Sequence, residues 1–219
     1  MECGEPLIPF LELSPRLFWG ETVWQYQRQQ LLRKTAAEKL AKAAESLPKG
    51  YGFSIIEGWR SPHIQKRMHL AGYARWKEKH PEWSHASLLR VTNRFTAPLH
   101  PKVPPPHSTG SAIDLWLCND KGVPLDHHSP FERRDRRVYP WNAKGISADA
   151  RKHREIMREV LESVGITNYP SEYWHYSFGD QGWAYRGGHD HAIYGSIIPP
   201  GFVPDPKEAI DEPLIWVTK

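Results

Sequence analysis

The order of apolar and polar positions predicts three helices. Apolar residues recur every three to four positions over residues 25–47, which indicates an amphipathic helix that ends at Pro48 and Gly50. Residues 62–79 are expected to form a second helix. Residues 149–164 place charges on one face and apolar side chains on the other, which predicts a third.

Short apolar runs at residues 51–58 and 111–117 predict two strands, and residues 119–122 favour a hairpin-like turn after the second. Residues 96–106 are rich in proline and are expected to form a loop. Because helices and strands do not alternate regularly, the pattern favours an α+β fold with a small, mostly antiparallel sheet flanked by helices.

The length of 219 residues fits one domain spanning residues 1–219. We expect residues 1–20 and the proline-rich tail, residues 197–219, to be peripheral. The 20 prolines argue against a helical bundle, because proline favours loops and short elements.

The charge balance argues against nucleic-acid binding. The net charge is +4, but basic residues are interspersed with acidic ones rather than gathered in a stripe. The basic cluster is residues 133–137, which Asp135 interrupts. A solvated loop is the simplest interpretation of this cluster, and a lid or a contact for an anionic substrate is the alternative.

The cysteine count and the N-terminus favour a cytoplasmic protein. Cys3 and Cys118 make no disulfide framework, and Cys118 is expected to be a buried thiol because it follows an apolar run. The N-terminus has no signal-peptide pattern, although a cleaved leader ahead of this sequence stays an alternative. No run of 18 apolar residues predicts a membrane span.

Two separated segments carry the side chains of a catalytic metal site. His107 and Asp114 lie seven positions apart around Gly110, and Glu172 precedes His175 by three. Two imidazoles and a carboxylate suit a zinc site with an open fourth position, and the second carboxylate could act as a base on water. Each element alone has a simpler interpretation, such as a core histidine or a glutamate paired on a helix surface.

Arg60 stands in a turn, residues 58–62, directly after the first predicted strand. At a strand end its guanidinium could reach into a cleft. A surface ion pair is the alternative interpretation of the same residue.

These residues resemble the zinc D-Ala-D-Ala peptidases of the M15 metallopeptidase family, particularly the D-alanyl-D-alanine dipeptidase branch of the vancomycin-resistance type. The His-x-x-Gly-x-Ala-x-Asp part of the family pattern is met at residues 107–114, and Glu-x-Trp-His at residues 172–175. The family's arginine turn is approximated at residues 58–62. Residues 165–181 resemble the dipeptidase branch throughout, and the overall resemblance covers residues 34–194.

The resemblance implies one Zn²⁺ bound by three ligands: His107, Asp114 and His175. It implies that Glu172 is the general base on the water at the metal and passes the proton to the leaving amine. Arg60 would stabilise the oxyanion, and loss of such a donor costs about 3–4 kcal/mol. Asp126 would receive the free ammonium of the substrate, although an aspartate after a turn is often only a cap.

Three positions depart from the family pattern. Pro105 stands where the family has serine, which removes a polar contact to substrate. Thr109 replaces an arginine and so removes a cation. Residues 17–20 replace a Tyr-x-x-x-Asn-Phe stretch that helps to close the pocket. We therefore expect catalysis to survive these changes and substrate choice to be affected.

The expected function is zinc-dependent hydrolysis of D-Ala-D-Ala or a similar short dipeptide, with no nucleic-acid or membrane partner. Two alternatives remain at this stage. One is a DD- or LD-carboxypeptidase or an endopeptidase on peptidoglycan stems, and the other is a zinc-containing binding module without catalysis. Glu172 and Arg60 together argue against the binding module, which needs neither a base nor an oxyanion donor.

Overall fold

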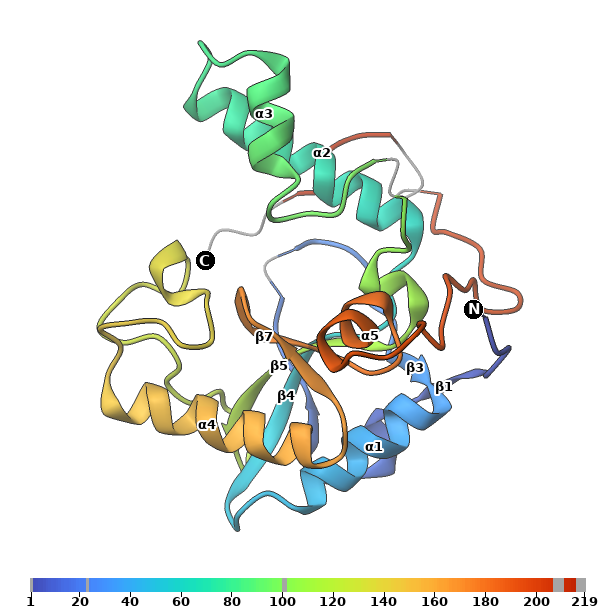
Figure 1. Ribbon diagram of the computed structural model, residues 1–219, viewed down its shortest axis with the longest axis vertical. Helices are drawn as coiled ribbons and strands as arrows, with labels where there is room; N and C mark the ends of the chain where they lie inside the picture. Colours follow the sequence, from blue (N-terminus) through green and yellow to red (C-terminus); the bar gives the residue numbers. More distant parts are fainter. Residues whose placement is uncertain (1, 23, 100–101, 207–210, 216–219) are drawn as a thin grey trace.

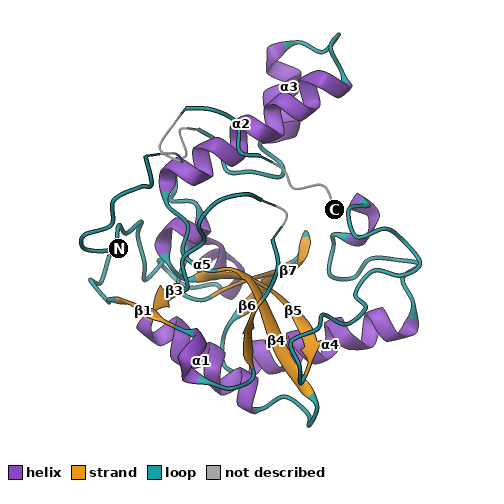
Figure 2. Ribbon diagram, turned by 180° about the vertical axis from the view of Figure 1, so that it is seen from behind, coloured by secondary structure: helices purple, strands orange, loops and turns teal. Residues whose placement is uncertain are grey.

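A five-stranded sheet forms the centre of the protein, with the strand order β2-β4-β5-β7-β6 (Figures 1 and 2). Its strands are β2 (Leu17–Trp19), β4 (Tyr51–Glu57), β5 (Ala112–Asn119), β6 (Thr167–Tyr169) and β7 (Glu172–Ser177). The β2–β4 pair is parallel, and the other three pairs are antiparallel. The expected α+β fold with a mostly antiparallel sheet is confirmed.

The computed structural model describes residues 2–22, 24–99, 102–206 and 211–215. Its helices are α1 (Lys34–Glu45), α2 (Pro62–Lys79), α3 (His85–Thr92), α4 (Ala148–Ser163) and α5 (Gln181–Gly187), with 3-10 turns η1 (Leu11–Leu13), η2 (Pro106–Thr109) and η3 (Arg136–Val138). A two-stranded sheet pairs β1 (Leu7–Pro9) with β3 (Leu31–Arg33). Within these described ranges, no helix has the length and apolar character needed to cross a membrane.

Helices α1 and α4 lie side by side against one face of the central sheet (Figure 1). Successive residues of a strand such as β5 point to opposite faces of the sheet. Ile113, Leu115 and Leu117 are fully buried in the core beneath these helices. The intervening residues of β5, which include Asp114 and Trp116, therefore face the other side of the sheet, where the candidate site lies.

The helix expected over residues 25–47 begins only at Lys34, so its first part is wrong. Residues 31–33 instead form β3, which pairs with β1, and Arg33 has an extended backbone with ψ of 139°. The side chain of Arg33 is fully buried and donates to the carbonyl of Thr109. A partner strand more than 20 residues away therefore outweighs the local helical periodicity.

The other expected elements agree closely with the structure. Helix α2 occupies residues 62–79 as predicted. Helix α4 begins and ends one residue earlier than predicted, and β4 ends one residue earlier. Cys118 is buried and is a free thiol, as expected. The short helix α3 was not anticipated; with the end of α2 it projects from the body of the molecule (Figures 1 and 2).

The two end segments contribute to the core rather than lying only at the periphery. Phe10 is fully buried, and Leu17 packs in the same core cluster from the edge strand β2. In the tail, Leu214 is buried against Ile64 and Met68 of α2. The expectation of peripheral ends thus fails for these side chains.

Candidate metal centre and active site

Three acidic and imidazole side chains form one row across the central sheet. Glu57 of β4 is the register partner of Asp114 on β5, and Asp114 is the partner of His175 on β7. Partners in adjacent strands have neighbouring side chains on one face of the sheet. His175 Nδ1 lies 2.9 Å from Asp114 Oδ1. The sheet register therefore brings together groups that are 118 residues apart at the extremes.

His107 joins this row from η2, which immediately precedes β5. Gly110 ends that turn with φ of 72°, a left-handed conformation that favours glycine. His107 Nε2 lies 3.4 Å from Asp114 Oδ2, and Nδ1 donates to the carbonyl of Gly58 at 2.9 Å. Because that bond fixes the proton on Nδ1, the Nε2 lone pair is available to a metal.

One ligand atom from each of His107, Asp114 and His175 lies within 4.8 Å of the other two. Two imidazole nitrogens and a carboxylate oxygen are a donor set suited to a divalent transition metal with an open coordination position. The three residues predicted as ligands are thus brought together. The buried ring of His107 and the buried ring of His175 cross at 74° with centroids 5.0 Å apart.

The electrostatics of this triad favour cation binding. Burial opposes ionisation of Asp114, but His107 and His175 outweigh it and hold the pKa of the Asp114 carboxyl well below its usual range. Burial lowers the pKa of His107, which favours the neutral imidazole that a metal ligand requires. For His175 burial acts in the same direction, but the hydrogen bond to Asp114 and the nearby carboxylates raise its pKa overall.

Arg60 points into the same site rather than making only a surface ion pair. Its side chain is 11% exposed, and Nη2 lies 3.9 Å from Asp114 Oδ2. Its Nη1 donates to Gln65 Oε1 at 2.8 Å, and its backbone N–H donates to the carbonyl of His107. The guanidinium is therefore fixed beside the ligand triad by both side-chain and backbone contacts.

Glu57 is a site residue that the sequence reasoning missed. Its Oε2 lies 3.4 Å from Arg60 Nε and accepts a hydrogen bond from the Tyr26 hydroxyl. Burial, with the Asp114 charge, raises the pKa of Glu57 to about 8 despite the opposing effect of Arg60. Its Oε1 has no hydrogen-bond partner among the described residues. The available signal was a glutamate at the end of an apolar strand, three residues before Arg60.

Glu172 begins β7, on the strand that carries His175. Burial raises the pKa of the Glu172 carboxyl to about 7, and the charges of His175, Asp114 and Arg60 act on it as well. A carboxylate with a pKa near neutral can both accept and donate a proton at physiological pH. Glu172 thus has the electrostatic environment that a general base beside the triad requires.

Asp126 lies apart from these charge interactions and is engaged in a loop. Its Oδ1 accepts from the backbone N–H groups of His128 and Ser129 at 3.0 and 2.9 Å, and its Oδ2 accepts from the Ser147 hydroxyl at 3.1 Å. Burial acts to raise the pKa of Asp126, but these hydrogen bonds outweigh it and lower the pKa to about 2. Ser147 also caps α4 through Ala150. Ammonium binding by Asp126 stays a prediction.

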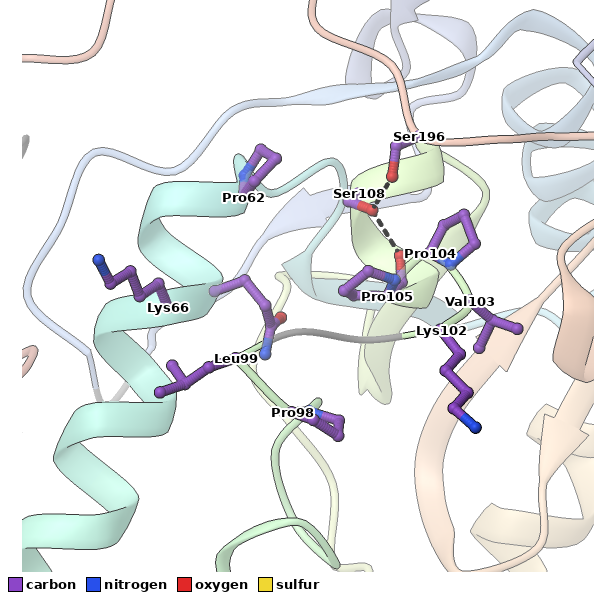
Figure 3. A pocket seen from close by; sticks show the side chains of 11 residues that line it. Pro62, Lys66, Pro98, Leu99, Lys102, Val103, Pro104, Pro105, Ser108 and Ser196 are labelled. Carbon is purple, nitrogen blue, oxygen red and sulfur yellow. Dashed lines mark hydrogen bonds between the residues drawn. The ribbon is translucent and has the colours of Figure 1, made fainter. Parts of the chain in front are cut away.

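Two departures from the family pattern lie in or next to η2, the turn that carries His107: Pro105 is its N-cap and Thr109 its last residue. Pro105 lines a cavity of about 400 Å³ between the start of α2 and the proline-rich loop (Figure 3). At its wall the Ser108 hydroxyl donates to the Pro105 carbonyl and contacts the Ser196 hydroxyl. Thr109 is fully buried, and its hydroxyl donates to the Pro106 carbonyl at 2.6 Å.

Comparison with known proteins finds similarity to one family of peptidases. The family profile of peptidase M15, described as D-ala-D-ala dipeptidase, matches residues 17–193. A D-alanyl-D-alanine dipeptidase of Synechocystis sp. is 32% identical, over 90% of this chain and 93% of the relative. Relatives with the same name in Enterococcus faecalis and Enterococcus faecium are 28% and 29% identical, each over 75% of this chain and 81% of the relative.

Among solved structures, the LdcB LD-carboxypeptidase is similar with a TM-score of 0.44 and 17% identity, over 88% of this chain and 76% of that chain. The range matched by the family profile contains every residue of the triad and both Glu172 and Arg60.

Proposed function

The chain belongs to the M15 peptidase family of D-Ala-D-Ala dipeptidases, and on that premise we propose that it cleaves D-alanyl-D-alanine or a similar short dipeptide with D-configured residues. The observation that carries this proposal is the sheet register that places Asp114 and His175 side by side with His107 and Arg60 around them. A binding module would have no use for the partly buried Glu172 and Arg60 beside the candidate ligands.

We propose Zn²⁺ as the metal, with His107, Asp114 and His175 as its ligands. When bound in such a site, zinc acts as a Lewis acid that polarises the scissile carbonyl and makes water more acidic. The hydrogen bond from His107 Nδ1 to the Gly58 carbonyl orients the ring, since a ligating histidine is aligned by the partner of its other nitrogen.

Glu172 is the proton carrier of the proposed reaction. In its carboxylate form it takes a proton from the water that attacks the scissile carbonyl, and it then gives this proton to the leaving amine. A positioned carboxyl group of this kind contributes about 10²–10⁴-fold in rate. The pKa of about 7 that burial gives Glu172 suits both directions of transfer.

Arg60 stabilises the negative charge that develops on the carbonyl oxygen. A fixed guanidinium in a buried site acts strongly, because it needs no reorganisation as the charge develops. Gln65 accepts from its Nη1 and Glu57 from its Nε, so these two residues restrict the direction in which the guanidinium points. Both are proposed as positioning residues.

We include a cytoplasmic location and a small dipeptide partner in this proposal. The two free thiols, Cys3 and Cys118, are consistent with a reducing compartment. Asp126 remains the proposed contact for the substrate ammonium, although its carboxylate already accepts three hydrogen bonds.

The deciding experiment compares hydrolysis of D-Ala-D-Ala with hydrolysis of N-acetyl-D-Ala-D-Ala by the zinc-loaded protein. A dipeptidase encloses the free ammonium of its substrate, so we expect a higher kcat/KM for the unblocked dipeptide. Preference for the acetylated substrate would instead indicate a carboxypeptidase. No hydrolysis of any member of a D,D-, L,D- and L,L-dipeptide panel would refute the peptidase proposal.

A further inference from the structure

A second cavity, of about 490 Å³, lies on the sheet between β2, β4 and β5. Ser54 of β4 and Trp116 of β5 are register partners and both line it. Trp116 is two residues beyond Asp114, so both side chains lie on the same face, separated by about 7 Å along the strand. The cavity is therefore adjacent to the metal centre on the face that the substrate must approach.

Two buried donors at the wall of this cavity have no partner among the described residues. Neither Ser54 Oγ nor Trp116 Nε1 has a hydrogen-bond partner among the residues that the structure describes, and Ser54 is fully buried. Buried polar groups in folded proteins are almost always hydrogen-bonded. The indole N–H can only donate, so a ligand that completes these groups must supply acceptor atoms.

A cation stands beside the two donors. The guanidinium of Arg133 stacks on the Trp116 ring, with Cζ 3.7 Å from the ring centroid. A stacked guanidinium keeps its N–H donors at its edge for a bidentate contact. Among the described residues, Arg133 stacks on Trp116 and is attracted by the Glu21 carboxylate, which also lines the cavity. Lys121 adds a second positive charge at the exposed rim, and Glu21 is the acidic residue there.

We propose that this cavity binds a carboxylate of the peptide substrate, through Arg133 with Ser54 and Trp116 as additional donors. The proposal rests on the proposed peptidase function. Each residue of a dipeptide extends about 3.5 Å from the scissile bond. Because the cavity adjoins the metal centre on the same face of the sheet, a peptide bound there can direct one end into it. The carboxylate belongs either to the C-terminus of the substrate or to an acidic side chain, and both present the same acceptor chemistry.

The test compares Arg133→Gln with wild type on two matched pairs of substrates. One pair is D-Ala-D-Ala and its C-terminal amide, and the other is D-Ala-D-Glu and D-Ala-D-Gln. Arg137→Gln is the control, because Arg137 lies in the same segment but is 71% exposed and pairs with Asp135. For the substrate whose carboxylate occupies the cavity, we expect Arg133→Gln to lower kcat/KM by about 10–100-fold, mainly by raising KM.

The pattern of losses identifies the carboxylate. A loss on D-Ala-D-Ala that is absent from its amide assigns the C-terminus, in which case D-Ala-D-Glu and D-Ala-D-Gln lose equally. A loss on D-Ala-D-Glu that is absent from D-Ala-D-Gln assigns the acidic side chain. The proposal is overturned if Arg133→Gln lowers kcat/KM equally for the two members of each pair, so that each neutral substrate is affected as much as its acid. It is also overturned if the kinetics do not change.

A binding measurement separates this proposal from the proposed function. Calorimetric titration of D-Ala-D-Ala, D-Ala-D-Glu and their two neutral counterparts into Glu172→Gln protein needs no turnover. If wild type hydrolyses none of the panel, the peptidase proposal fails. The carboxylate site is still supported if the double variant Glu172→Gln/Arg133→Gln binds a carboxylate ligand more weakly than Glu172→Gln does, while binding of the neutral counterpart is unchanged. Binding that does not depend on Arg133 overturns it.

Discussion

His175 Nδ1 and Asp114 Oδ1 are 2.9 Å apart across a register pair of β5 and β7. The contact joins an imidazole whose pKa is raised to a carboxylate whose pKa is well below its usual range. A metal cation that takes the place of the proton on His175 would also balance the negative charge of the Asp114 carboxylate. This pair, with His107, is therefore the centre on which zinc binding should depend.

Asp114→Ala is expected to abolish zinc binding. The substitution removes the one anionic ligand and leaves two imidazoles, which cannot retain the metal through dialysis. Zinc per chain, measured by elemental analysis, should fall from about one for wild type to near zero. Asp190→Ala, which removes an exposed carboxylate near α5, is the matched control and should keep its zinc. Equal zinc in both variants would remove Asp114 from the ligand set.

Glu172→Gln is expected to separate metal binding from catalysis. The amide has nearly the shape of the carboxyl group but cannot accept the proton, so hydrolysis of D-Ala-D-Ala should fall by about 10²–10⁴-fold. The zinc content should stay at the wild-type value. Glu162→Gln, on the solvent-facing side of α4, should change neither quantity. Retained activity in Glu172→Gln would assign the base to another group.

The three candidate ligands followed from residue type, from the short spacing of His107 and Asp114, and from the resemblance of residues 172–175 to the family pattern. His107 and Asp114 are close along the chain, and Gly110 adopts the left-handed turn between them. Glu57 could not be predicted in this way. It reaches the site through the register of β4 against β5, which shifts between Ile55 and Glu57, and no local pattern encodes such an irregularity.

The short strands were also beyond local analysis. Strands β1 and β3 contain three residues each, and they are stabilised by one another rather than by their own propensity. The apolar residues Leu31 and Leu32 fit a helical stripe equally well. Only the contact with residues 7–9 decides between the two conformations, and that contact appears once the chain is folded.

Gln65→Ala is expected to lower kcat through Arg60. The substitution removes the 2.8 Å bond to Arg60 Nη1, so the guanidinium loses part of its orientation. We expect about a fivefold fall in kcat with little change in KM, since loss of one hydrogen bond costs about 1 kcal/mol. Arg60→Ala should cost about 10²–10³-fold. Lys66→Ala, the neighbour on α2 that pairs with Asp211, is the control.

If Gln65→Ala raised KM and left kcat unchanged, Gln65 would contact the substrate directly. Such a result would mean that Arg60 keeps its orientation without the hydrogen bond to Gln65. An unchanged kcat and KM would show that Glu57 and the backbone contact to His107 are sufficient to orient Arg60.

Asp126→Asn tests whether the carboxylate serves the loop, the substrate ammonium or both. Loss of the charge weakens the bonds from His128 and Ser129, so the free energy of unfolding should fall by about 1 kcal/mol. If the predicted ammonium contact exists, KM for D-Ala-D-Ala should rise about tenfold, with no rise for N-acetyl-D-Ala-D-Ala. A loss of stability with unchanged KM would restrict Asp126 to the loop.

His127 should make the stability of the metal-free protein depend on pH. This histidine is 2% exposed, its Nε2 accepts from the Leu117 N–H, and its Nδ1 donates to the Leu125 carbonyl. Burial, with the charges of His153 and Arg154, lowers the pKa of His127 to about 3. Between this value and the unfolded pKa of about 6.5, only the unfolded state takes up the proton. Stability is therefore lost as pH falls through that window.

Urea unfolding of wild type and His127→Gln in the presence of a chelator, at several values from pH 7 down to pH 4, measures this contribution. Glutamine removes the titrating group, so the variant should be less stable than wild type at pH 7. The difference should shrink on acidification by up to about 1.4 kcal/mol per pH unit below pH 6, because only wild type carries the proton linkage of His127. A difference that stays constant with pH would mean that His127 titrates with the same pKa in the folded and unfolded states, which the Leu117 N–H donated to its Nε2 opposes.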